Sequence, residues 1–82
     1  MAYHFANKAW EDYLNSEKND KKKIESMIKD LVRGNKIAHA EQLTHDLAGF
    51  SSAHINKKDR LVYKLEGETL YIINCKGHYG DK

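Results

Sequence analysis

The sequence contains no proline and only one cysteine, Cys75, among its 82 residues. A single cysteine cannot form an internal disulfide, and the apolar segment around Cys75 is typical of a small buried core residue. Five glycines without any proline give little sign of a disordered linker. The composition therefore predicts one folded domain spanning residues 1–82.

The sequence also lacks a long hydrophobic run. No apolar stretch approaches the roughly 20 residues of a membrane span, and the N-terminus has no basic segment followed by an apolar one. We therefore expect a cytoplasmic protein without a membrane partner. The formal net charge is only +2, which does not by itself indicate a nucleic-acid partner, so any attraction to phosphate must be local.

Motifs for common cofactors are missing as well. There is no glycine-rich phosphate loop and no dinucleotide fingerprint, which argues against an NTPase or a Rossmann enzyme. His39, His45 and His54 lack the local spacings of known zinc sites. We expect no metal and no cofactor.

The N-terminal half has the pattern of one short strand and two helices. Residues 2–6 predict the strand, and Asn7 is placed to cap a helix whose core stripe is formed by Trp10, Tyr13 and Leu14. Residues 19–20 offer a second cap, and Gly34 supplies the left-handed residue that commonly follows a helix end, so a helix is predicted over residues 21–33. Its apolar residues recur at helical spacing: Ile24, Met27, Ile28, Leu31 and Val32.

The C-terminal half predicts strands. Residues 35–46 read as a connection that enters a strand near Leu43, residues 50–55 as a strand, and residues 56–59 as a four-residue turn. Residues 60–65 alternate as in a half-buried strand, whereas residues 70–73 are a nearly continuous apolar run that suits a strand covered on both faces. Glu66 and Gly67 join these two strands as a hairpin. The predicted fold is α+β, a small antiparallel sheet packed against two N-terminal helices in the order β-α-α-β-β-β.

The hairpin places three polar residues at one end of the sheet. If its strands are antiparallel neighbours, Arg60 at the start of the first lies near His78 and Tyr79 beyond the end of the second. An arginine offers a permanently charged fork for phosphate oxygens, a histidine can act as acid or base near neutral pH, and a tyrosine can stack on a base. These are the groups that metal-free RNA cleavage requires, although a solvated arginine and a loose C-terminal pair fit the same pattern.

Residues 60–63, the apolar last strand and the closing His78 and Tyr79 resemble the YoeB branch of the RelE-type bacterial toxins, the ribosome-dependent mRNA interferases of toxin–antitoxin systems. Residues 9–14 are similar to the first helix of that branch and residues 28–30 to its second. Residues 41–49 resemble its Glu-Pro-Leu-Lys-His-x-Leu-x-Gly segment. The resemblance extends over the whole chain in the same order and spacing.

This resemblance implies a RelE-like fold and a toxin that cuts mRNA in the ribosomal A site, without a metal, leaving a 2′,3′-cyclic phosphate. It implies that Glu41 is the general base, Arg60 the cation that stabilises the transition state, His78 the general acid and Tyr79 a substrate-positioning residue. The implied partners are the ribosome, mRNA and a cognate antitoxin of the YefM/Axe type, with a toxin dimer or a toxin–antitoxin hetero-oligomer as the assembly. The candidate RNA contacts are Lys21, Lys22, Lys23, His54, Lys57 and Lys58.

The sequence departs from the family pattern before the hairpin. Gln42 stands where proline is usual, and residues 52–55 read Ser-Ala-His-Ile where family members tend to have Ser-Arg-Arg-Ile. The lost arginines favour one alternative, a RelE-like fold without efficient cleavage that acts with its antitoxin in a DNA-binding repressor complex or on the ribosome. A generic small α+β RNA-binding domain is a further alternative.

Overall fold

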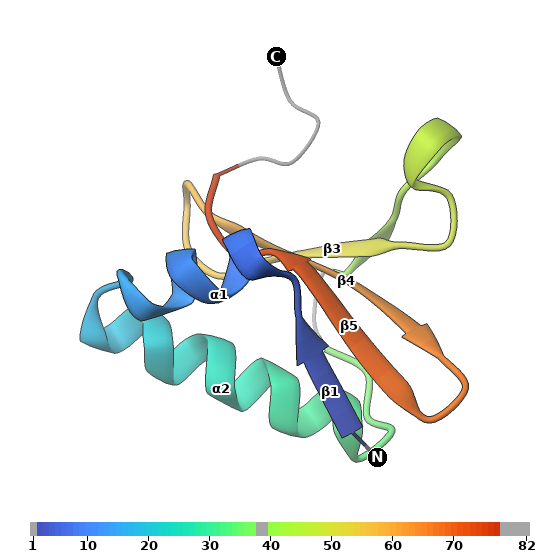
Figure 1. The fold of residues 1–82 in the computed structure, drawn as a ribbon, viewed down its shortest axis with the longest axis horizontal. Helices are drawn as coiled ribbons and strands as arrows, with labels where there is room; N and C mark the ends of the chain where they lie inside the picture. The colour runs from blue at the N-terminus through green and yellow to red at the C-terminus, as the bar shows by residue number, and fades with distance from the viewer. Residues whose placement is uncertain (1, 38–39, 78–82) are drawn as a thin grey trace.

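A five-stranded sheet carries both helices on one of its faces (Figure 1). The structure is a computed structural model, and it describes residues 2–37 and 40–77. The elements in chain order are β1 (Ala2–Phe5), α1 (Asn7–Leu14), α2 (Lys18–Val32), β2 (Glu41–Gln42), a 3-10 helix (His45–Leu47), β3 (Ser51–His54), β4 (Arg60–Glu66) and β5 (Thr69–Asn74). No helix among these residues is long and apolar enough to cross a membrane.

The strand order across the sheet is β1-β5-β4-β3-β2. The pairs formed by β2, β3, β4 and β5 are antiparallel, whereas β1 lies parallel to β5 at the edge of the sheet. The α+β prediction with two N-terminal helices is confirmed. The structure adds the parallel edge pair, which joins the N-terminus to the last strand, and the two-residue strand β2.

In both helices the N-cap is a different residue from the one that the sequence predicts. The N-cap of α1 is Ala6 in extended conformation, so Asn7 is the first helical residue and makes no capping bond. The helix α2 begins at Lys18, after Glu17, three residues before the predicted start. Asp20 therefore lies in the first turn, where a carboxylate favours the helix dipole, and the lysines of residues 21–23 follow this turn. Gly34 follows the helix with φ of +84°, as predicted.

The predicted core stripe of α1 is only partly buried. Trp10 and Leu14 are 46% and 48% exposed, Tyr13 is half-buried, and the buried residue of this helix is Ala9. A small side chain lets the short helix approach the sheet closely, so the aromatic rings lie beside that contact instead of within it. The prediction for α2 is confirmed, because Ile24, Met27, Ile28 and Leu31 are all buried and Val32 packs against them.

The hairpin exists as predicted, with its turn one residue later. β4 continues through Glu66, and the turn residues are Gly67, with φ of +62°, and Glu68. The predicted burial of its two strands is wrong. Val62 is buried beside Leu61 and Tyr63, whereas β5 alternates between buried and more exposed residues.

The order of strands explains why β4 is more buried, and β5 less buried, than the sequence predicted. β4 is the central strand of the five, so its first half is flanked by neighbours on both edges, while its last residues extend past β3. β5 keeps Leu70 and Ile72 toward the helices and exposes 37% of Tyr71 on the other face. Apolar composition alone does not distinguish a side chain in the core from one on the sheet face without helices.

Cys75 is a core residue, as predicted. It is 2% exposed, and its thiol donates to the carbonyl oxygen of Ala9 over 3.1 Å, which links the end of β5 to α1. Burial, with smaller contributions from Asp12 and Asp59, raises the pKa of this thiol to about 11. A thiol that stays protonated is a poor nucleophile.

Candidate functional site on the open face of the sheet

The polar residues of interest lie on the face of the sheet that the helices leave uncovered, here called the open face. Paired residues of neighbouring strands point to the same face, and alternate residues along a strand do so too. Ala53 and Leu61 are paired and belong to the core. The residues next to them along each strand therefore face away from the helices, and the register places on this face Glu41, Ser52, His54, Arg60, Val62, Lys64 and Tyr71, among others. The register shift between Val62 and Tyr63 pairs Asn74 with Val62 and so adds Asn74 to this row.

One row of this face runs across four strands. Glu41 pairs with Ser52, Ser52 with Val62, and Val62 with Asn74. Ser52, Val62 and Asn74 are buried, whereas Glu41 is exposed at the sheet edge. The next row contains His54 and Arg60, which are direct partners. Two strand spacings separate Glu41 from the strand of Arg60, or about 10 Å across the sheet.

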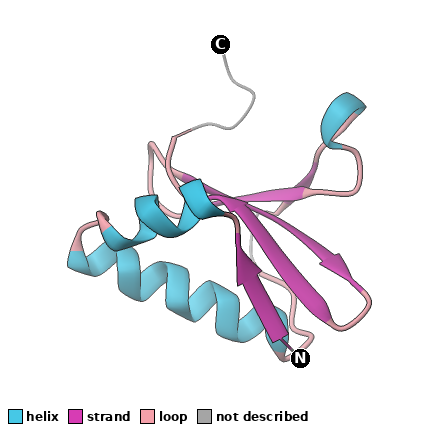
Figure 2. Ribbon diagram, viewed as in Figure 1, coloured by secondary structure: helices cyan, strands magenta, loops and turns pink. Residues whose placement is uncertain are grey.

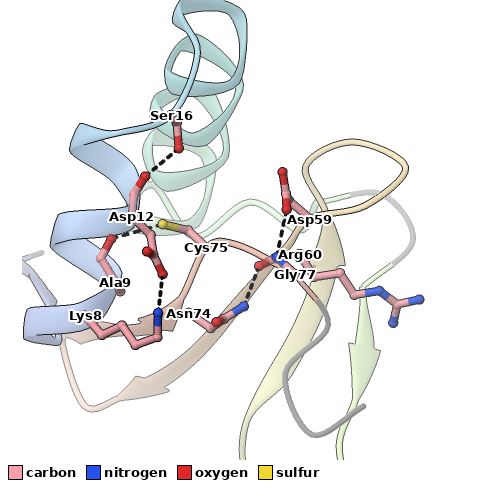
Figure 3. A network of polar contacts seen from close by, with 9 residues as sticks. All are labelled: Lys8, Ala9, Asp12, Ser16, Asp59, Arg60, Asn74, Cys75 and Gly77. Carbon is pink, nitrogen blue, oxygen red and sulfur yellow. Dashed lines mark hydrogen bonds and ion pairs between the residues drawn. The ribbon is translucent and has the colours of Figure 1, made fainter. Parts of the chain in front are cut away.

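Arg60 is half-buried at the start of β4, and its guanidinium points away from the other labelled side chains in Figure 3. Its Nε is buried and has no hydrogen-bond partner among residues 2–37 and 40–77. Its carbonyl oxygen accepts a 3.1 Å hydrogen bond from the side chain of Asn74, which fixes the backbone beneath it. Because Nε itself has almost no accessible surface, an anion would have to bind the more accessible part of this half-buried side chain.

The C-terminal end of β5 returns to Arg60. The backbone N–H of Arg60 donates to the carbonyl oxygen of Gly77 over 3.1 Å, and the N–H of Gly77 donates to Oδ1 of Asp59 over 2.7 Å (Figure 3). The hairpin therefore brings residue 77 beside Arg60. His78 and Tyr79 lie outside the residues that the structure describes.

Four of the six candidate RNA contacts line two cavities. Lys23 and His54 line a cavity of about 440 Å³ between α2 and the end of β3. Lys57 and Lys58 in the turn before β4 line a groove of about 540 Å³ together with Lys76. The structure thus places four of the candidates at the end of the sheet where Arg60 lies.

The other two lysines of the run have separate surroundings. Lys21 lies over the ring of Tyr13, with its Nζ 5.9 Å from the ring centroid, and is half-buried. Lys22 is exposed and lines none of these cavities. The three consecutive lysines therefore point to different parts of the surface, as a helix requires.

The sequence interpretation missed the part that Asp59 plays in this end of the sheet. It counted Asp59 only as a turn residue, yet the carboxylate accepts hydrogen bonds from Gly77 and from the side chain of Asn56. Burial favours the neutral acid and by itself would raise the pKa of Asp59. The two hydrogen bonds and the positive charges of Lys76 and Lys58 together outweigh burial and lower this pKa. The available signal was an asparagine three residues before an aspartate, a spacing that favours side-chain bonds within a turn.

An aromatic groove of about 440 Å³ occupies another part of the molecule. It lies between β1, α1 and α2 and shares no residue with the open face; its rings come from Tyr3, Phe5, Trp10 and Tyr13. Across it, the hydroxyl of Tyr13 donates to Oε2 of Glu25 over 2.5 Å. This hydrogen bond and, to a lesser extent, burial raise the pKa of Tyr13 to about 12.

Within the described residues, no three His, Cys, Asp or Glu side chains are grouped so as to hold a metal ion. The chemistry that this face can support rests on its cations Arg60 and Lys64, the carboxylate of Glu41 and the imidazole of His54. These groups can bind a phosphodiester and move protons.

Comparison with known proteins gives a consistent family. Residues 5–79 match the model of a family described as YoeB-like toxins of bacterial type II toxin–antitoxin systems. The protein Toxin YoeB from Synechocystis sp. is 38% identical over 84 residues, covering 96% of this chain and 98% of the relative.

Solved structures agree with this result. The heterotetrameric complex of YoeB-YefM toxin–antitoxin from Staphylococcus aureus contains a chain that is 34% identical, with a TM-score of 0.83 and coverage of 94% of this chain and 95% of the other. The YoeB dimer from the same organism is 33% identical, with a TM-score of 0.84 and coverage of 96% and 98%.

Proposed function

Because this chain belongs to the YoeB-like toxin family of bacterial type II toxin–antitoxin systems, we propose that it is an endoribonuclease that cuts mRNA in the A site of translating ribosomes in the cytoplasm. The observation that carries the proposal is the surroundings of Arg60. This half-buried arginine lies on the same open face as Glu41, and its backbone is hydrogen-bonded to Gly77, from which the chain continues to His78.

The proposed reaction is an attack of the ribose 2′-oxygen on the neighbouring phosphorus. Glu41 accepts the proton of the 2′-hydroxyl, the new bond forms a 2′,3′-cyclic phosphate, and the bond to the 5′-oxygen breaks. His78 donates a proton to that leaving oxygen, and Tyr79 positions the substrate. Arg60 stabilises the charge that develops on the phosphoryl oxygens, because its planar fork matches them. No metal or cofactor enters this scheme.

The positions of Glu41 and Arg60 support these roles. Glu41 is exposed on a short edge strand and lies about 10 Å across the sheet from β4, so a bound nucleotide can lie between the two side chains. The lysines near this end, Lys23, Lys57 and Lys58, and His54 would contact the RNA backbone of the ribosome or the message. Lys21 and Lys22 complete the proposed set of contacts.

The experiment that tests this function is primer extension on an mRNA translated in the presence of the purified protein. Wild-type protein should produce cuts in the A-site codon, and His78→Gln should lower the cleavage rate by about 10²- to 10⁴-fold, the usual contribution of a positioned acid or base. Unchanged cutting by the His78→Gln variant would rule out the proposed role of His78.

The proposed partner is an antitoxin of the YefM/Axe type encoded with the toxin. The support is the S. aureus heterotetramer, whose toxin chain has the same fold and 34% identity. The S. aureus toxin dimer supports a toxin dimer as the free form. Co-purification with the product of the adjacent antitoxin gene and a mass measurement of the free toxin test the two assemblies.

A second function is favoured by one feature of the open face. His54, which is exposed and pairs with Arg60, stands where the family tends to carry an arginine. A weaker cation beside Arg60 suits a protein that binds its antitoxin or the ribosome without cutting. The same primer-extension assay distinguishes the two functions, because a protein that only binds leaves no A-site cuts.

A further inference from the structure

Asp59 connects two segments that are 18 residues apart in the sequence. Its Oδ1 accepts the N–H of Gly77 over 2.7 Å, and its Oδ2 accepts the side-chain amide of Asn56 over 2.9 Å. Asp59 is half-buried just before β4. Its hydrogen bonds to the two segments are therefore partly shielded from water. One carboxylate thus ties the turn between β3 and β4 to the end of the last strand.

The turn itself has its own hydrogen bonds. Oδ1 of Asn56 accepts the backbone N–H groups of Lys58 and Asp59, each over 2.8 Å, and Ile55 donates its N–H to the carbonyl oxygen of Asp59 over 2.9 Å. These bonds fix the backbone of Asp59 without any contribution from Gly77. The carboxylate can therefore serve as a fixed acceptor for the incoming segment.

Gly77 is held on both sides of its α-carbon. Its N–H is bound by Asp59 and its carbonyl oxygen by the N–H of Arg60, and its φ is +72°, in the left-handed region. The peptide carbonyl of Gly77 is bonded covalently to residue 78. Any constraint on Gly77 is therefore a constraint on where the next residue begins.

We propose that Asp59 is a positioning residue for the reaction, which anchors Gly77 and so fixes the origin of the segment bearing His78 and Tyr79 next to Arg60. The inference rests on the proposed function, because it assigns Asp59 an effect through His78. Asp59 does not contact the reacting atoms in this scheme. Its effect is confined to holding Gly77, the last described residue before the proposed acid.

The positioning role of Asp59 depends on an oxygen that accepts the N–H of Gly77. Two matched variants distinguish the loss of this oxygen from the loss of the negative charge. Asp59→Ala and Asp59→Asn lose the same negative charge, but only Asn keeps an oxygen that can accept the N–H of Gly77. Misplacement of a reacting group by about 1 Å costs roughly 100-fold in rate. We therefore expect Asp59→Ala to lower the single-turnover cleavage rate by about 10- to 100-fold, while Asp59→Asn retains most of it and both bind ribosomes like wild type.

Asn56→Ala controls for damage to the turn. It removes the two turn bonds and the bond to Oδ2 but leaves the acceptor for Gly77 in place. The proposal expects a smaller loss of rate than in Asp59→Ala. Equal losses in Asn56→Ala and Asp59→Ala, or equal losses in the Ala and Asn variants of Asp59, would overturn it.

A double-mutant cycle with His78→Gln gives the decisive readout. If Asp59 acts through His78, Asp59→Ala should cost little further rate once the acid is absent. The same fold loss in both backgrounds shows a general effect on the fold and overturns the positioning role. Full activity of His78→Gln alone, in contrast, refutes the role of His78 on which this inference rests, and an absence of A-site cuts by the wild-type protein refutes the proposed function. Circular dichroism and antitoxin binding verify folding, and Asp59→Leu, which also lacks an acceptor oxygen, replaces Asp59→Ala if the latter does not fold.

Discussion

The backbone N–H of Arg60 donates a hydrogen bond of 3.1 Å to the carbonyl oxygen of Gly77. This bond joins the first residue of β4 to the segment after β5, at the end of the sheet where the register also places His54. The backbone of Arg60 is thus constrained, while its guanidinium points away from the other labelled side chains (Figure 3). An arginine held in this way is suited to act on a bound anion.

Arg60→Ala should lower A-site cleavage by about 10²- to 10³-fold, the loss seen when a preorganised donor to developing charge is removed. Arg60→Lys should recover only part of the rate, because an ammonium lacks the planar fork. Rates are measured by primer extension under single-turnover conditions. The control is Lys64→Ala, a cation on the same face that instead contacts Glu66 and the ring of Phe50. If Lys64→Ala were as inactive as Arg60→Ala, a specific role for Arg60 would be lost.

The second prediction concerns the base. Glu41→Gln should reduce the cleavage rate by about 10²- to 10⁴-fold, because the amide cannot accept the 2′-hydroxyl proton. Gln42→Ala is the matched control, since Gln42 is the adjacent exposed residue of the same two-residue strand and pairs with Ser51. Both rates come from the same assay. A wild-type cleavage rate in the Glu41→Gln variant would show that another residue is the general base.

The sequence predicted the fold where periodicity and chain order agree. The helix α2, which apolar spacing predicted, and the antiparallel hairpin are both present in the structure (Figure 2). The predicted starts of the helices differ from the observed ones because the prediction gave too much weight to local capping side chains. Asn7 is a good capping residue, yet the extended residue before α1 is Ala6, whose N–H donates to Ile72 of the last strand. Pairing in the sheet decided that boundary.

The candidate site was predictable in part. Strand direction alone placed Arg60 at the end of the sheet to which the chain returns, and Gly77 lies there. The sequence pattern could not predict that Glu41 lies on the same face of the sheet as Arg60. The strand β2 has only two residues, and its place in the sheet depends on pairing with β3. The bonds of Asp59 were missed because they join residues 18 positions apart.

The third prediction tests the lysines near this end of the sheet. Lys57→Ala and Lys58→Ala should each weaken ribosome binding and flatten its dependence on salt, by a slope of about 0.7 to 0.9 for each lost phosphate contact. Binding is measured at several salt concentrations. Lys18→Ala removes an exposed lysine at the start of α2 that lies outside the proposed contacts and serves as the control. Equal salt slopes for all variants would show that residues 57 and 58 do not contact phosphate.

The last prediction concerns the contact between α1 and α2 on the helix side of the sheet. The Tyr13 hydroxyl donates to Glu25, and this bond together with burial raises the pKa of Tyr13 from 10.0 to about 12. A group whose pKa is higher in the folded state contributes stability that is complete below its unfolded pKa and is lost as pH rises through its folded pKa. The free energy of unfolding should therefore fall between about pH 10 and pH 12.

The matched variant is Tyr13→Phe, which keeps the ring in the aromatic groove and removes only the hydroxyl. It should be less stable than wild type near neutral pH, and the difference should shrink as the pH approaches 12. Urea unfolding over this range measures both proteins. Burial also raises the pKa of Tyr63 and Cys75, but these groups titrate in both proteins and cancel in the difference. Parallel stability curves for wild type and Tyr13→Phe would show that the bond to Glu25 does not link the two helices.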